Sequence, residues 1–129
     1  MQNSSADFEI KFYEGILKKK PDFIEALVAL AELYTQKGLY QEGLDLDQRL
    51  VALRPEDPII LYNLACSYSL LNDIDASFEA IRKAISLGYD NVEYLKKDDD
   101  LKNLRDDKRF QKYILEVSHP HKDAKKNTL

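Results

Sequence analysis

The sequence predicts an all-α solenoid built from stacked pairs of antiparallel helices, and two observations support this prediction. Residues 25–57 and 59–91 share one pattern at a spacing of 34 positions, a period typical of two-helix repeats. Within this pattern, Leu27, Leu30, Ala31 and Tyr34 recur as Leu61, Leu64, Ala65 and Tyr68. The chain of 129 residues also holds only four glycines and four prolines, so few sharp turns interrupt its helices.

Each expected helix combines an apolar stripe with a residue that ends it. The predicted helices span residues 6–20, 23–37, 40–54, 58–71 and 74–87. Pro21 ends the first helix, and Asp22 is expected to cap the second. Gly38, Asn72 and Gly88 end later helices because they adopt the left-handed conformation at little steric cost. The connections are two to four residues long, so neighbouring helices must pack antiparallel.

Composition and charge exclude several classes of function. The chain is 44% hydrophobic and 33% charged, which predicts a soluble helical protein, and its net charge of −4 argues against a general nucleic-acid binder. No stretch approaches the roughly 20 apolar residues that cross a bilayer. The first ten residues lack the pattern of a secretory signal, and Cys66 is the single cysteine. We therefore expect a cytoplasmic location.

The repeated pattern resembles the tetratricopeptide repeat (TPR) family. The resemblance rests on Leu-x-x-Leu-Ala-x-x-Tyr, on Gly38 or Asn72 before the turn, and on the small residues Gly43 and Ser77 after it. It covers about residues 7–89 and implies a right-handed superhelical stack. The implied divisions are a half repeat (6–21), two full repeats (22–57 and 58–89), a C-terminal helical cap (90–117) and a flexible tail (118–129).

The predicted cap resembles the segment that ends many groups of such repeats. Tyr89 stands where the family pattern has proline, so we expect the array to end after its second full repeat. An uncovered terminal repeat would expose apolar surface, so the cap should cover it with an apolar face. That face comprises Leu95, Leu101, Leu104, Phe110, Tyr113 and Ile114. We interpret the acidic run at residues 98–100 as a solvated helix end.

The family resemblance also implies that the first helix of each repeat lines a concave groove that binds peptides. The implied positions are Glu25, Val28, Glu32, Thr35 and Gln36 in the first repeat, and Ile59, Tyr62, Asn63, Cys66, Ser69 and Leu70 in the second. Four of them, Ile59, Tyr62, Cys66 and Leu70, form an apolar strip at helical spacing, here called the apolar strip. Two interpretations remain open: the strip receives a partner helix or peptide, or it is buried by the C-terminal segment or in a homodimer.

The implied groove does not suit the acidic C-termini that some TPR domains bind. Those domains use lysine, arginine and asparagine in the groove, whereas this groove has Glu25 and Glu32, and Asn63 alone fits the pattern. We expect the partner to be a protein or peptide segment of basic or apolar character, and not a nucleic acid or a membrane.

Asp47 is an anomaly on the apolar stripe of its helix. The family usually has a large apolar residue at this position. A buried carboxylate without a partner is costly, so we expect Asp47 to be hydrogen-bonded or turned to solvent. A tyrosine hydroxyl is the plausible partner in this tyrosine-rich chain, and a structural role is favoured over a functional one.

Catalysis has little support in the sequence. His119 and His121 are only two potential metal ligands, and Cys66 has neither a nearby histidine nor a helix N-terminus to lower its pKa. No glycine-rich phosphate loop occurs. We therefore predict a non-enzymatic interaction module, an adaptor or scaffold, with no cofactor and no metal. The alternatives are a structural unit that dimerises through the apolar strip and an accessory subunit of an enzyme.

Overall fold

The structure is a computed structural model that describes residues 4–118, a region that contains helices and no strand. The helices are α1 (Ser4–Lys19), α2 (Ile24–Gln36), α3 (Tyr40–Leu53), α4 (Pro58–Leu70), α5 (Ile74–Ser86), α6 (Val92–Leu95), the 3-10 helix η1 (Asp99–Leu101), α7 (Lys102–Arg105) and α8 (Lys108–Val117). The five predicted helices begin and end within two residues of their expected bounds.

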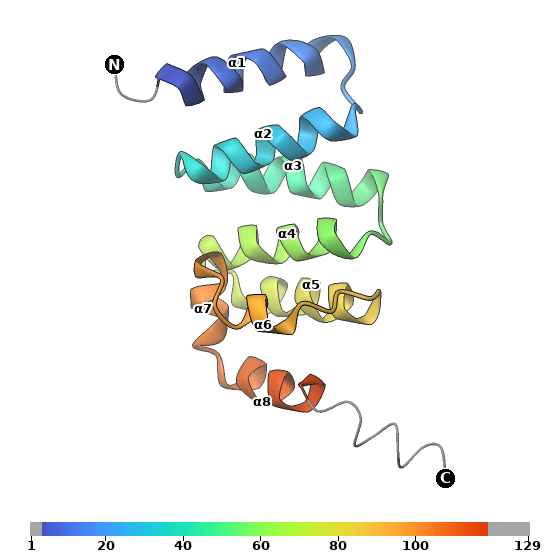
Figure 1. The fold of residues 1–129 in the computed structure, drawn as a ribbon, viewed down its shortest axis with the longest axis vertical. Helices are drawn as coiled ribbons and strands as arrows, with labels where there is room; N and C mark the ends of the chain where they lie inside the picture. Colours follow the sequence, from blue (N-terminus) through green and yellow to red (C-terminus); the bar gives the residue numbers. More distant parts are fainter. Residues whose placement is uncertain (1–3, 119–129) are drawn as a thin grey trace.

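Helices α1 to α5 form a stack in which each helix packs against the next along the chain. Figure 1 shows them following one another along the long axis of the molecule, with α6 to α8 at the C-terminal end. Short loops reverse the chain between neighbours, which places the helices antiparallel. The predicted all-α stack of helix pairs is confirmed.

The repeated helix ends have the expected backbone geometry. Gly38 and Asn72, which occupy equivalent positions, have φ angles of 82° and 62°. After Gly38 the amide of Leu39 donates to the carbonyl of Tyr34 at 2.8 Å, and the equivalent bond after Asn72 measures 2.9 Å. This bonding satisfies carbonyls that the helix end would leave open, as in the Schellman motif.

The predicted cap at Asp22 is wrong. Helix α2 begins at Ile24 with Phe23 at its N-cap, and no side chain bonds the free amides there. Asp22 lies one position too early, and its carboxylate is instead 3.9 Å from the guanidinium of Arg49. Helix α4, by contrast, has a capping aspartate in Asp57.

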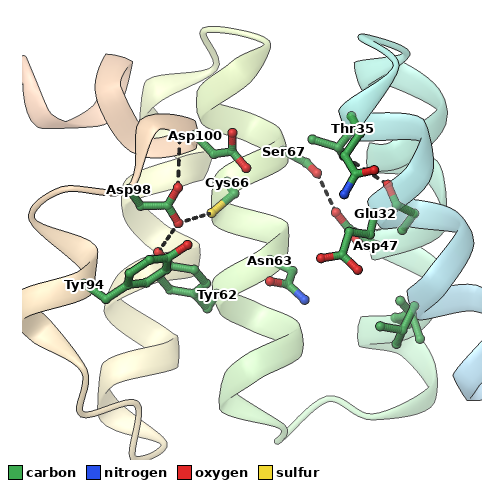
Figure 2. A pocket seen from close by; sticks show the side chains of 14 residues that line it. Glu32, Thr35, Asp47, Tyr62, Asn63, Cys66, Ser67, Tyr94, Asp98 and Asp100 are labelled. Atoms are coloured by element: carbon green, nitrogen blue, oxygen red, sulfur yellow. Dashed lines mark hydrogen bonds between the residues drawn. The ribbon is translucent and has the colours of Figure 1, made fainter. Parts of the chain in front are cut away.

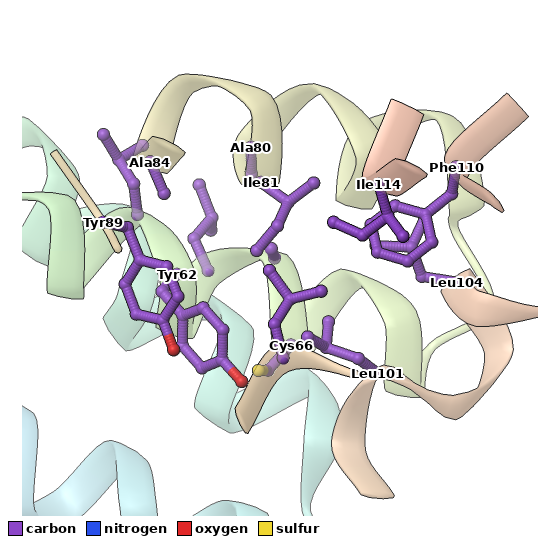
Figure 3. Close-up of a cluster of buried hydrophobic side chains, with 14 of the residues drawn as sticks. Tyr62, Cys66, Ala80, Ile81, Ala84, Tyr89, Leu101, Leu104, Phe110 and Ile114 are labelled. Atoms are coloured by element: carbon purple, nitrogen blue, oxygen red, sulfur yellow. The ribbon is translucent and has the colours of Figure 1, made fainter. Parts of the chain in front are cut away.

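Two apolar clusters form the core. The N-terminal cluster joins α1 to α3 with the start of α4 and contains Ile10, Leu27, Leu30, Ala31, Leu46, Leu50 and Ile60. The C-terminal cluster joins α4 and α5 to the cap, from which Leu95, Leu101, Leu104, Phe110 and Ile114 are buried (Figure 3). The prediction that this cap covers the last repeat with its apolar face is therefore confirmed for these five residues.

Small residues allow close helix packing within both repeats. A Cβ atom added to Gly43 would lie 2.9 Å from the hydroxyl oxygen of Thr35, so α3 could not hold a larger residue there without a shift. At the equivalent position Ser77 is fully buried, and its hydroxyl donates to the carbonyl of Ala65 at 2.7 Å. Ala65 is itself fully buried, as expected for a point where α4 and α5 approach closely.

Candidate functional site

A cleft of about 280 Å³ opens between α2, α3, α4 and the cap. Its lining residues are Val28, Ala31, Glu32, Thr35, Gln36, Asp47, Leu50, Tyr62, Asn63, Cys66, Ser67, Tyr94, Asp98 and Asp100. Figure 2 shows α4 running between the cap segment that carries Tyr94 and Asp98 and the helix that carries Thr35. Segments far apart in the sequence therefore meet at this one place.

Seven of the predicted groove residues line this cleft. They are Val28, Glu32, Thr35 and Gln36 from α2, and Tyr62, Asn63 and Cys66 from α4. Glu25 and Ile59 lie in the first turns of α2 and α4, where they are exposed outside the cleft. Ser69 and Leu70 lie near the C-terminal end of α4 and do not line the cleft either.

The apolar strip on α4 is not an exposed surface. Tyr62 is 6% exposed and Cys66 is 8% exposed, whereas Ile59 is 55% exposed. The ring of Tyr62 stacks on Tyr89 with 4.5 Å between centroids. The C-terminal segment therefore buries the centre of this strip, as one of the two open interpretations held, and leaves Ile59 exposed.

The cap also buries Ser69, which the sequence placed in the groove. Its hydroxyl accepts the amide proton of Leu104 at 3.2 Å, and its carbonyl accepts the side-chain amide of Asn103 at 2.9 Å. Both donors come from α7, about a full repeat further along the chain. Part of the expected second-repeat groove is thus occupied by the protein's own C-terminal segment.

Asp98 fastens the cap to α4 and is not a solvated helix end. It is buried, and its Oδ2 accepts the hydroxyl proton of Tyr62 at 2.5 Å. Its Oδ1 accepts the amide proton of Asp100 at 3.0 Å, while Arg105 donates to its carbonyl at 2.5 Å. The interpretation of the acidic run as solvated is wrong for Asp98, because the sequence does not reveal that a tyrosine hydroxyl from α4 faces this residue, whereas Asp99 is exposed.

The environment of Cys66 disfavours the reactive thiolate form. Burial, followed by the negative charge of Asp98, raises the pKa of the thiol well above its ordinary value. Burial likewise raises the pKa of the neighbouring Tyr62, with Cys66 and the bond to Asp98 adding to the effect. Both groups stay protonated at neutral pH, so neither offers an anionic nucleophile.

Asp47 is buried on α3, and its partner is a serine. The hydroxyl of Ser67, on α4, donates to Oδ2 of Asp47 at 2.5 Å. Burial raises the pKa of Asp47 to about 6, and the bond from Ser67 lowers it in part. The expected tyrosine partner is wrong: Ser67 donates instead, and the hydroxyl of Tyr62, the tyrosine of α4 that lines the same cleft, donates to Asp98.

The charged side chains that line the cleft are all acidic. They are Glu32, Asp47, Asp98 and Asp100, with no lysine or arginine among the lining residues. Burial raises the pKa of Asp100, and the neighbouring Asp98 and Asp99 raise it further. A bound cation would relieve this repulsion, whereas a carboxylate would increase it. Asn63 and Gln36 add neutral groups that can donate and accept hydrogen bonds.

Other site chemistries gain no support from the described residues. Within residues 4–118 no cluster of three or more histidine, cysteine, aspartate or glutamate side chains could hold a metal ion. His119 and His121 lie outside the described residues, as does nearly all of the predicted tail. None of the described helices combines the length and the apolar character needed to span a membrane.

Comparison with known proteins adds both sequence and structural relatives. Residues 59–90 match the tetratricopeptide repeat family. A chloroplastic protein of Arabidopsis thaliana is 31% identical over 102 residues, which cover 75% of this chain and 30% of that protein. The chain thus spans less than a third of the length of this curated relative.

Two solved structures share the fold. One is MamA, residues 41 to the end, from Desulfovibrio magneticus RS-1, with a TM-score of 0.68 at 20% identity over 90% of this chain and 68% of that one. The other is the MamA RS-1 ArsTM double mutant, with a TM-score of 0.66 at 19% identity over 92% of this chain and 68% of that one. At this level of identity the likeness concerns the fold alone.

Proposed function

Since this chain is a tetratricopeptide repeat protein, we propose that it is a non-catalytic interaction module that binds a basic segment of a partner protein in its acidic cleft. The observation that carries the proposal is the charge of the cleft: four carboxyl groups line it and no cationic side chain does. A lysine- or arginine-bearing segment would complement this charge, and complementarity of this kind mainly sets specificity and the rate of association.

The cleft also has features suited to an extended segment. Its volume of about 280 Å³ accommodates one or two side chains, so most of a bound segment would lie across its mouth. Val28 and the half-exposed ring of Tyr94 offer apolar contact at the rim. The amides of Gln36 and Asn63 can bond the backbone of such a segment. The buried centre of the apolar strip supports no second proposal of self-association.

A selection from random displayed peptides, with the full chain as bait, tests this function without a known partner. We expect the enriched peptides to carry net positive charge and to bind more weakly as salt concentration rises. Glu32→Lys places a cation at the exposed side of the cleft and should weaken binding at least tenfold. Glu79→Lys makes the same charge change on an exposed part of α5 outside the cleft and is the matched control.

The proposal fails if the enriched peptides are neutral or acidic. It also fails if Glu32→Lys and Glu79→Lys weaken binding equally, because the effect would then come from net charge and not from the cleft. The cytoplasmic location stays a prediction.

A further inference from the structure

We propose that Asp47 anchors the bound segment by accepting a lysine ammonium group at its Oδ1 atom. This inference rests on the proposed function and identifies the residue that decides which side chain enters the cleft. It goes beyond the overall acidic charge of the cleft, because it assigns the selective contact to one buried carboxylate.

The hydrogen bonding of Asp47 is incomplete. Asp47 is 4% exposed, and the hydroxyl of Ser67 donates to Oδ2. Among residues 4–118, no hydrogen bond or ion pair reaches Oδ1. Figure 2 shows the carboxylate of Asp47 across α4 from the cap, with the hydroxyl of Ser67 bonded to it. Oδ1 remains accessible to solvent from the cleft, so a cation can reach it there and compensate a charge that burial disfavours.

The second repeat shows that folding does not require an acid at this position. The residue 34 positions after Asp47 is Ile81, which is fully buried in the C-terminal cluster. An apolar side chain therefore fills the equivalent site of the same fold within the same chain. In the first repeat a carboxylate replaces this apolar side chain, and the carboxylate lines the cleft.

No positively charged side chain lines the cleft beside Asp47. The other charged residues of the cleft are Glu32 from α2 and Asp98 and Asp100 from the cap, all acidic. From α4 come Asn63, Ser67 and the protonated Tyr62 and Cys66, which bring no positive charge. Burial raises the pKa of Asp47 to about 6, so above that pH the group is ionised without a compensating charge. An ammonium group beside it would lower this pKa again.

The single open oxygen favours lysine over arginine. A guanidinium group gains its advantage by bonding both oxygens of a carboxylate at once, and Ser67 already occupies one of them. A lysine ammonium group is a compact point charge with three donors. One donor can meet Oδ1 of Asp47, which leaves two for the side chains of Asn63 and Glu32 at the same cleft.

The test uses three synthetic probes that differ at one position. Each is a seven-residue peptide of alanine and leucine, blocked at both ends, with lysine, acetyl-lysine or arginine at its centre. Affinities come from NMR titrations of the isotope-labelled full chain. The chemical shift of the Asp47 carboxyl carbon, recorded as a function of pH, gives the pKa of this group. The variants are Asp47→Asn and, as a matched control, Asp45→Asn, which removes an exposed carboxylate from the same helix.

We expect the lysine probe to bind wild type at least tenfold more tightly than the acetyl-lysine probe. Asp47→Asn should reduce that ratio to about one, and Asp45→Asn should preserve it. Saturation with the lysine probe should lower the pKa of Asp47, whereas saturation with the acetyl-lysine probe should leave this pKa unchanged. Equal lysine preference in wild type and Asp47→Asn overturns the proposal, and so does tighter binding of the arginine probe.

The outcomes separate this inference from the proposed function. If all three probes shift the amides of Glu32 and Asn63 without preference for lysine, Asp47 is not the anchor, yet the cleft still binds peptides. If neither these probes nor any display-selected peptide shifts those amides, the proposed function fails and this inference fails with it.

Discussion

Replacing Asp47 with asparagine should stabilise the fold, and increasingly so as pH rises. Folding raises the pKa of Asp47 from its ordinary value of 3.8 to about 6, because burial disfavours the charged form. The native state therefore binds this proton more tightly than the unfolded state does, and stability falls as pH rises from about 4 through 6. The two values differ by about two pH units, which at about 1.36 kcal/mol per unit gives roughly 3 kcal/mol.

Asparagine keeps the shape of the side chain and an oxygen for the hydroxyl of Ser67, but it cannot ionise. Between pH 4 and pH 8 the stability of Asp47→Asn relative to wild type should increase by about 2–3 kcal/mol. Urea unfolding followed by helical circular dichroism at several pH values measures this difference. Other carboxylates titrate in the same range, but they are common to both proteins and cancel in the comparison.

Asp45→Asn controls for the loss of one negative charge on α3. Asp45 is exposed and accepts a hydrogen bond from Gln41 at 3.1 Å, so its replacement should leave the pH profile parallel to that of wild type. If the Asp47→Asn profile also runs parallel to wild type, or if its advantage shrinks with rising pH, the assignment of a buried and disfavoured carboxylate is refuted.

Three further substitutions test the packing of the repeats and the cap. Gly15 lies inside α1, and a Cβ atom added there would meet nothing within 4 Å. Gly15→Ala should therefore raise the free energy of unfolding, measured with denaturant, by about 0.5–1 kcal/mol, and a decrease would contradict this. Tyr62→Phe leaves the buried Asp98 without its hydroxyl donor, which should cost about 1–3 kcal/mol and speed hydrogen exchange mainly in residues 94–105. Uniform exchange changes would count against a local role for this bond. Ala65→Phe should reduce the free energy of unfolding by about 3 kcal/mol, because Ala65 is fully buried where α4 and α5 pack closely. A mutant with the same unfolding midpoint as wild type would contradict this packing.

The fold was predictable because its signals are local. The apolar stripes, the small residues and the left-handed positions at Gly38, Asn72 and Gly88 each act within one helix or its nearest turn. Such signals also predicted which apolar residues of the cap are buried, since their spacing marks one face of each short helix. The capping error at Asp22 is an error of one position: helix α2 begins at Ile24, so its N-cap is Phe23 and not Asp22.

The site was predictable only in part. Its α2 side and the central residues of α4 follow from the family resemblance, which implies that the first helix of each repeat lines the groove. The other side of the cleft comes from the cap, whose Asp98 meets Tyr62 across 36 residues of sequence. No local pattern encodes that pairing, so the burial of the apolar strip and the additional carboxyl groups of the cleft emerged only from the three-dimensional arrangement.

The central claim is that the acidic cleft between α2, α3, α4 and the cap is the binding surface of this protein. Amide chemical-shift mapping of the labelled full chain with a display-selected basic peptide tests it most directly. The account predicts that the largest shifts fall on Glu32, Asn63 and Asp100, which line the cleft. Largest shifts on the exposed face of α1, at Phe8 and Phe12, with none in the cleft, would contradict it.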